Sequence, residues 1–158
     1  MEREKVIEVK DLVKKFGTFT ANDHLTFDVY RGEIFGFLGA NGAGKTTAMR
    51  ILCGLSRPTS GKVTVAGIDA SRRPEEIKKR IGYMSQRFSL YEDLTVRENI
   101  ELYGGIYGMT IKEIVPRREA LLERLRFTEY GDTLIGSLPL GLRQKLAFAV
   151  AVFHDPEI

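Results

Sequence analysis

Apolar residues in the first half of the chain follow patterns typical of short β-strands around one helix. Residues 6–12 and 25–30 alternate apolar and polar side chains, which predicts two half-buried strands. Residues 34–38 form an unbroken apolar run, typical of a strand buried on both faces. Further elements are expected in this order: a helix over about 44–53, a strand over 62–66, a short helix over 74–80 and a buried strand over 81–84.

From about residue 88 the pattern becomes that of helices. Thr95-x-x-Glu98 is a capping box, in which side chain and backbone of the two residues bond reciprocally at a helix start. Thr110-x-x-Glu113 predicts a second such start, with Pro116 either beginning the helix that follows or kinking it. A last helix is expected over about 142–153.

Composition restricts the class of protein. With 158 residues, 43 % of them hydrophobic and 28 % charged, the chain suits one globular domain. A net charge of +3 is too small to argue for nucleic acid as a partner. One cysteine excludes an internal disulfide framework and a cysteine-based zinc site. The longest apolar run, at 146–153, is far shorter than the ~20 residues that cross a bilayer, so we expect the isolated chain to be soluble.

The segment with the clearest chemistry is Gly39-Ala40-Asn41-Gly42-Ala43-Gly44-Lys45-Thr46, which matches the phosphate-loop pattern G-x-x-x-x-G-K-[ST]. Its glycines let backbone N–H groups turn towards phosphate oxygens at the positive end of the following helix. Lys45 is expected to reach the β- and γ-phosphates, and Thr46 to offer its hydroxyl to Mg²⁺. The alternative is a glycine-rich turn without a ligand. The position after the predicted buried strand 34–38 and before a helix favours the phosphate loop.

The run GANGAGKTTAMRILCGLSRPTSGKVTVAGID, from Gly39 to Asp69, resembles the core of an ABC-transporter nucleotide-binding domain. The resemblance implies an α/β fold: a P-loop NTPase (RecA-like) core with an antiparallel β subdomain over 1–87, then an α-helical subdomain over 88–158. The form NGAGKTT is closer to exporters, of the ABC-2 or multidrug-efflux type, than to importers. The cofactors it implies are ATP and Mg²⁺, with Thr47 also in the phosphate loop.

Two further site residues are implied by this resemblance. Phe16 falls where the family places an aromatic ring that stacks on adenine; the alternative is an ordinary buried aromatic residue. Gln86 matches the glutamine of the family's glutamine loop, whose amide oxygen coordinates Mg²⁺ and helps to position the attacking water. The alternative for Gln86 is a plain surface residue. Lys45 and Gln86 are thus the candidate catalytic residues.

The family's signature segment, ordinarily L-S-G-G-Q, reads Leu138-Pro139-Leu140-Gly141-Leu142 in this chain. Pro139 has neither a hydroxyl nor an N–H to donate to a phosphate. Three interpretations stay open: an altered but working cap on the nucleotide of an opposite subunit, a degenerate cap, or a plain helix start. We expect the carboxylates of the family's Walker B strand to lie beyond Ile158, so that the chain is a C-terminally incomplete domain. Asp155 is the alternative metal carboxylate.

The function implied by the resemblance is ATP binding and hydrolysis that drive export across a membrane. The expected partners are a second nucleotide-binding domain, identical or different, and transmembrane permease subunits, with no nucleic acid. The expected location is peripheral, on the cytoplasmic side of the cell membrane. The alternatives are a soluble ABC ATPase of translation or DNA repair, which the short span 61–81 argues against, and a phosphate-loop kinase of small molecules. We expect this chain to bind nucleotide without turnover.

Overall fold

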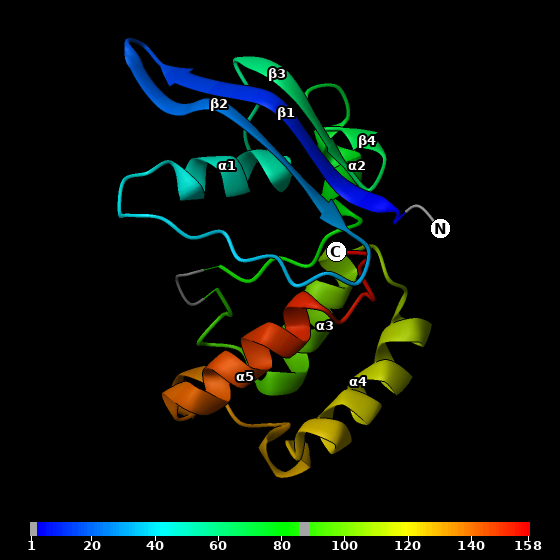
Figure 1. Cartoon of the computed structure of the whole chain (residues 1–158). Coiled ribbons are helices and arrows are strands. Elements are labelled where there is room, and N and C mark those ends of the chain that lie inside the picture. The colour runs from blue at the N-terminus through cyan, green and yellow to red at the C-terminus, as the bar shows by residue number, and fades with distance from the viewer. Residues whose placement is uncertain (1–2, 86–88) are drawn as a thin grey trace. The chain divides into compact units, whose positions relative to one another are not determined.

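The computed structural model describes residues 3–85 and 89–158, which divide into two compact units. The first unit extends to Ile81 and includes Glu157 and Ile158, and the second comprises Gly82–Pro156. The first unit holds all the strands of the described chain, whereas the second is helical (Figure 1). The predicted change from strands to helices is therefore present.

A four-stranded antiparallel sheet forms the first unit. Its strands are β1 (Lys5–Phe16), β2 (Phe19–Tyr30), β3 (Ser60–Val65) and β4 (Ile68–Asp69), in the order β2-β1-β3-β4. Val9 lies opposite Phe27 of β2 on one side and Val63 of β3 on the other, and Val9 and Val63 are buried. The alternating residues thus place one face of the sheet in the core.

Both long strands extend beyond the predicted ends because a bulge interrupts their alternation. The pairing of β1 with β2 shifts register between Val9 and Leu12, where Asp11 has a left-handed φ of 56°. The Asp11 backbone N–H donates to the Thr26 hydroxyl at 2.9 Å. An extra residue in one strand moves the following side chains to the other face. The sequence pattern therefore ended at Leu12, whereas the strand continues to Phe16.

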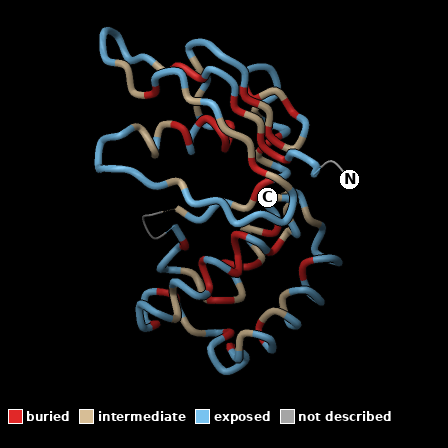
Figure 2. Tube along the Cα trace, in the orientation of Figure 1, coloured by how far each residue is buried: buried red, intermediate tan, exposed pale blue. Residues whose placement is uncertain are grey.

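Two helices complete the first unit: α1 (Lys45–Leu52) and α2 (Pro74–Lys78), with Pro74 in the first turn of α2 as expected. Ile51 of α1 and Ile77 of α2 are completely buried and belong to one apolar cluster with the inner residues of the sheet. Figure 2 colours the buried residues of the chain red. The start of α1 carries the candidate site.

The predictions of buried strands at 34–38 and 81–84 are wrong. Neither segment forms a strand among the described residues: Ile34 is 100 % exposed and Leu38 is 93 % exposed. A strand buried on both faces needs hydrogen-bonded neighbours, and the strands of this sheet pair only with one another. The apolar side chain of Phe35 instead stacks on Phe27, with ring centroids 5.2 Å apart. The RecA-like part of the predicted fold is consequently represented by α1 and its loop, without a parallel sheet.

The second unit consists of α3 (Val96–Ile106), α4 (Ile111–Leu125) and α5 (Leu140–Ala151), with 3-10 turns at Thr128–Tyr130 and Ile135–Ser137. Its core contains one or more fully buried residues from each helix, namely Val96, Ile100, Leu122 and Leu146. The helices therefore share one apolar interior. No helix in the described part of the chain is both long enough and apolar enough to span a membrane.

Both predicted capping boxes are confirmed. The Thr95 N–H donates to the Glu98 carboxylate at 2.7 Å, and the Glu98 N–H donates to the Thr95 hydroxyl at 3.2 Å. Thr110 and Glu113 form the equivalent box at the start of α4. Pro116 does not begin this helix, because α4 starts five residues earlier, at Ile111. Proline lacks the N–H for one intrahelical bond, and the helix continues through it.

Candidate nucleotide site

The segment 39–44 forms a loop that leads directly into α1. Gly44 is the residue before the helix and has a left-handed backbone, with φ 78° and ψ 4°. Its carbonyl accepts the first helical hydrogen bond, from the Ala48 N–H at 3.0 Å. Gly42 is also left-handed, with φ 83°. These conformations turn the loop sharply, as a phosphate-binding nest requires.

Only glycine fits position 44. A Cβ placed on Gly44 would lie 2.0 Å from the carbonyl oxygen of Ala21 and 2.7 Å from the side-chain nitrogen of Asn22. Real Cβ atoms do not approach a backbone oxygen so closely. The start of β2 thus lies directly against the junction between the loop and α1, and this contact holds the junction in place.

Lys45 folds back over the loop that precedes it. Its ammonium donates to the carbonyl oxygens of Gly39 at 2.5 Å and Ala40 at 2.6 Å. The positive charge is therefore held over the loop by backbone dipoles. An anion in the loop would meet this ammonium together with the backbone N–H groups at the helix start, which no intrahelical carbonyl can satisfy.

Electrostatics at the start of α1 favour an anion. The first turn contains no acidic residue and no side chain caps it, so its positive dipole is not neutralised. Asn41, Gly42 and Ala43 are exposed, which leaves the loop open to a ligand. Thr46 is exposed as well, and its hydroxyl is of the kind that phosphate-loop proteins offer to Mg²⁺. Thr47 is half-buried.

Mg²⁺ held on nucleotide phosphates needs few protein ligands, and it usually keeps several waters. Among the described residues, no three histidine, cysteine or acidic side chains gather into a cluster that would hold a metal ion by itself. The oxygen of Thr46 at an anion-binding loop is compatible with a metal that arrives with the nucleotide. The donor set therefore fits Mg²⁺ bound together with phosphate.

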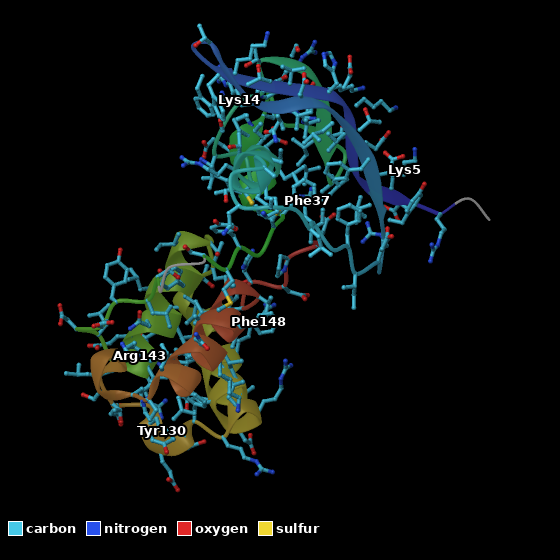
Figure 3. All side chains as sticks on the ribbon, turned by 60° about the vertical axis from the view of Figure 1, so that its left-hand side comes forward. Lys5, Lys14, Phe37, Tyr130, Arg143 and Phe148 are labelled. Carbon is cyan, nitrogen blue, oxygen red and sulfur yellow. The ribbon has the colours of Figure 1, made fainter. Side chains whose placement is uncertain are left out.

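Phe16 is an exposed aromatic residue rather than a buried one. It ends β1 opposite Phe19, and 55 % of its surface is exposed. The ammonium of Lys14, a residue labelled in Figure 3, lies 4.9 Å from the centre of the Phe16 ring. The same ammonium donates to the Arg57 carbonyl at 2.8 Å. One face of the ring is thus engaged by a cation. An exposed ring is available for stacking.

The remaining predicted residues lie outside the first unit or outside the described part of the chain. Gln86 lies outside the described residues. The signature-like segment belongs to the second unit, where Pro139 precedes α5 and a Cβ on Gly141 would meet nothing within 4 Å. Asp155 follows the end of α5 and is exposed, with φ 58°, so it is not at the end of a strand. This agrees with the helical pattern predicted for 142–153.

The sequence pattern did not identify Asn22 as a residue of the site. Asn22 is 3 % exposed, and its side-chain NH₂ donates to the Gly44 carbonyl at 3.1 Å. The signal that could identify Asn22 is a polar residue at a buried position of a strand. Because β2 is only partly buried along its length, the sequence pattern does not show which of its polar residues face inward.

Comparison with known proteins places the chain in a family. The family model described as "ABC transporter" matches residues 22–158. The chain is 43 % identical over 155 residues to "Probable multidrug ABC transporter ATP-binding protein YbhF" of Escherichia coli, and 39 % identical over 135 residues to "ABC transporter ATP-binding protein NatA" of Bacillus subtilis. It is also 38 % identical over 153 residues to "Bacitracin transport ATP-binding protein BcrA" of Bacillus licheniformis.

These alignments cover 98 %, 85 % and 97 % of this chain but only 27 %, 55 % and 49 % of the three relatives, so the chain spans about a quarter to about half of their length. Among solved structures, the "ATP binding subunit of ABC transporter" superposes with a TM-score of 0.83 at 30 % identity, over 96 % of this chain and 63 % of that one. The structure of cbiO1 from Clostridium perfringens superposes with a TM-score of 0.82 at 24 % identity, over 97 % of this chain and 63 % of that one, which is a likeness of fold. Since the family model extends over most of the sequence, including the phosphate loop and α1, this chain belongs to the ABC transporter family.

Proposed function

We propose that this chain binds ATP through the loop 39–47 and serves as the ATP-binding part of an ABC exporter. The observation that carries the proposal is the loop itself: a left-handed Gly44 at the start of a helix without acidic residues, with the Lys45 ammonium folded over it. Family membership supports ATP as the nucleotide.

Within this proposal each residue of the loop has a separate task. Backbone N–H groups from Gly39 to Thr47 surround the phosphates, and Lys45 exchanges its carbonyl partners for the β- and γ-phosphate oxygens. Phe16 stacks on the adenine with the ring face that Lys14 leaves open. Thr46 and Gln86 would hold Mg²⁺, which, when bound, neutralises charge that develops between the phosphates.

Export is proposed from the names of the relatives. They include proteins named for multidrug transport, bacitracin transport and Nod factor export. By analogy we propose that the whole protein is peripheral to the cytoplasmic side of the membrane, where it pairs with a second nucleotide-binding domain and with transmembrane permease subunits. The solved relative described as part of the complex cbiONQ supports assembly with other subunits.

The 158-residue chain is expected to bind nucleotide without hydrolysing it. Attack by water on the γ-phosphate needs a group that orients the water and metal ligands on both sides of the nucleotide. Thr46 and Gln86 supply a part of these groups. Purified chain should therefore release no phosphate from ATP above the level of a Lys45→Ala control. A steady release that depends on Lys45 would show that a carboxylate of this chain is catalytic, with Asp155 the first to test.

The binding proposal is tested with Lys45→Ala and a charge-matched control, Lys62→Ala, at an exposed position of β3. ATP should raise the thermal unfolding midpoint of the wild type and of Lys62→Ala, because nucleotide binds the folded form and not the unfolded chain. Lys45→Ala should show no such rise, because it lacks the cation that faces the phosphates. An equal rise in all three proteins would overturn the assignment of the loop.

A further inference from the structure

Asn22 makes a contact that ordinary strand packing does not explain. It lies near the start of β2, and its side-chain NH₂ donates to the carbonyl of Gly44 at 3.1 Å. The same carbonyl accepts the Ala48 N–H at 3.0 Å. Two donors thus hold one oxygen atom at the junction between the phosphate loop and α1.

The direction of this carbonyl determines the direction of a neighbouring N–H group. The Gly44 carbonyl and the Lys45 N–H belong to one peptide unit, and the described chain contains no cis peptide bond. In a trans peptide the C=O and N–H bonds point in opposite directions. Because Asn22 draws the Gly44 carbonyl towards β2, the Lys45 N–H is directed away from β2. This N–H is among the first four of α1, which have no carbonyl partner within the helix.

We propose that Asn22 is a positioning residue for nucleotide binding: it fixes the 44–45 peptide plane so that the Lys45 N–H is aimed into the loop before phosphate arrives. The inference rests on the proposed function, since it concerns the same loop. Preorganised donors bind an anion more tightly than donors that must first be oriented. Asn22 itself touches no phosphate in this proposal and acts through Gly44.

A second observation supports a role other than packing. The Oδ1 atom of Asn22 is buried and has no hydrogen-bond partner in the structure. Leaving such a buried acceptor unsatisfied costs folding free energy. An apolar residue has no such cost, and Val29 is an apolar residue at another buried position of the same strand. A leucine at position 22 would avoid the unsatisfied oxygen but would lose the donor to Gly44. The bonded NH₂ is therefore the group of this side chain that has a use in the structure.

Asn99 shows what a purely structural amide looks like in this protein. It is the other buried polar residue of the described chain, in α3 of the second unit. Its oxygen accepts the Tyr91 N–H at 2.8 Å, and its NH₂ donates to the carbonyls of Tyr91 at 2.9 Å and Thr95 at 3.0 Å. Both ends of Asn99 are satisfied, and none of its partners belongs to the phosphate loop. It is a matched control for Asn22.

The experiment compares Asn22→Leu, Asn22→Asp and Asn99→Asp with the wild type in the whole 158-residue chain. The ATP dissociation constant is measured by calorimetry at a temperature where circular dichroism shows each variant folded, and stability is measured separately by urea unfolding. Both Asn22 variants should raise the dissociation constant about tenfold, the equivalent of one lost hydrogen bond. Asn99→Asp should lower stability and leave the dissociation constant unchanged.

Hydrogen exchange without nucleotide provides a second measurement. Loss of the Asn22 donor should speed exchange of the Ala48 amide, whose bond shares the Gly44 carbonyl, whereas Asn99→Asp should not. If Asn22→Leu does not fold, the ATP dissociation constant of the isosteric variant Asn22→Asp tests the inference. An unchanged dissociation constant in folded Asn22 variants would overturn the inference. If the wild type itself binds no ATP, the proposed function fails, and the exchange rate of Ala48 alone decides whether Asn22 orders the junction.

Discussion

The helix starts of the two units are built in opposite ways. In the second unit, α3 and α4 begin with Thr95 and Thr110, and a glutamate three residues later closes each start with reciprocal hydrogen bonds. In the first unit, α1 begins after Gly44 with no side-chain cap and no acidic residue in its first turn. The same backbone N–H groups are thus satisfied internally in one unit and left available in the other.

The capped helix starts stabilise their helices, whereas the uncapped start of α1 is suited to binding a ligand. A capping box stabilises its helix locally and needs nothing from the rest of the chain. The open start of α1 gives up that stabilisation, and its geometry depends instead on long-range contacts from Ala21 and Asn22 on β2. An uncapped helix start that is held by a strand is suited to a ligand that supplies the missing acceptors.

The largest expected effect comes from filling the space behind the open helix start. Gly44→Ala should destabilise the first unit by more than about 2 kcal/mol, because alanine is strained at a left-handed φ and its Cβ would collide with the Ala21 carbonyl. Urea unfolding measures the change. Gly141→Ala in the first turn of α5 is the control; its Cβ has open space and should stabilise that helix by up to about 1 kcal/mol. Equal losses in both variants would show that the junction is not tightly packed.

The next effect concerns binding alone. Phe16→Ala should weaken ATP binding by about 1 kcal/mol, roughly fivefold, through loss of the stacking ring, whereas Phe16→Tyr should be nearly neutral. Stability should change little, because Phe16 is mostly exposed. Calorimetric titration with ATP measures the dissociation constants of the wild type and the two variants. The same affinity in all of them would remove Phe16 from the site.

A closed helix start should show the converse pattern. Thr95→Ala removes the hydroxyl that accepts the Glu98 N–H, and should lower the stability of the second unit by about 1 kcal/mol. The ATP dissociation constant of the folded variant should equal that of the wild type. A weaker affinity in Thr95→Ala, with α3 still formed, would break the separation between the two kinds of helix start.

The smallest effect is a dependence on pH. Hydrogen bonds from the Thr95 backbone and hydroxyl lower the pKa of Glu98 below its ordinary value of 4.5. A lowered pKa in the folded state means that the carboxylate contributes stability above about pH 4.5 and loses this contribution as the pH falls through the lowered value. The difference in unfolding midpoint between wild type and Glu98→Gln should therefore shrink below pH 4.5. A constant difference from pH 7 to pH 3 would contradict the charge contribution.

Local signals account for the elements that were predicted correctly. A capping box, a glycine-rich loop and the 3.6-residue spacing of apolar side chains act within a few residues, so Thr95, Thr110 and the start of α1 could be located from the chain alone. Segments 34–38 and 81–84 show the opposite case, because an apolar run becomes a buried strand only when other strands pair with it.

The sequence by itself determined the motif and the family: a phosphate-loop pattern that contains Lys45 and Thr46, and a resemblance to ABC ATPases that family membership confirms. Only the tertiary structure decided that Phe16 is exposed, that β1 continues through a bulge, and that Asn22 reaches Gly44 across 22 residues of chain. The physical reason is range. Motifs depend on neighbours along the chain, whereas burial and a hydrogen bond between distant residues depend on how the strands pair and on what packs against the start of α1.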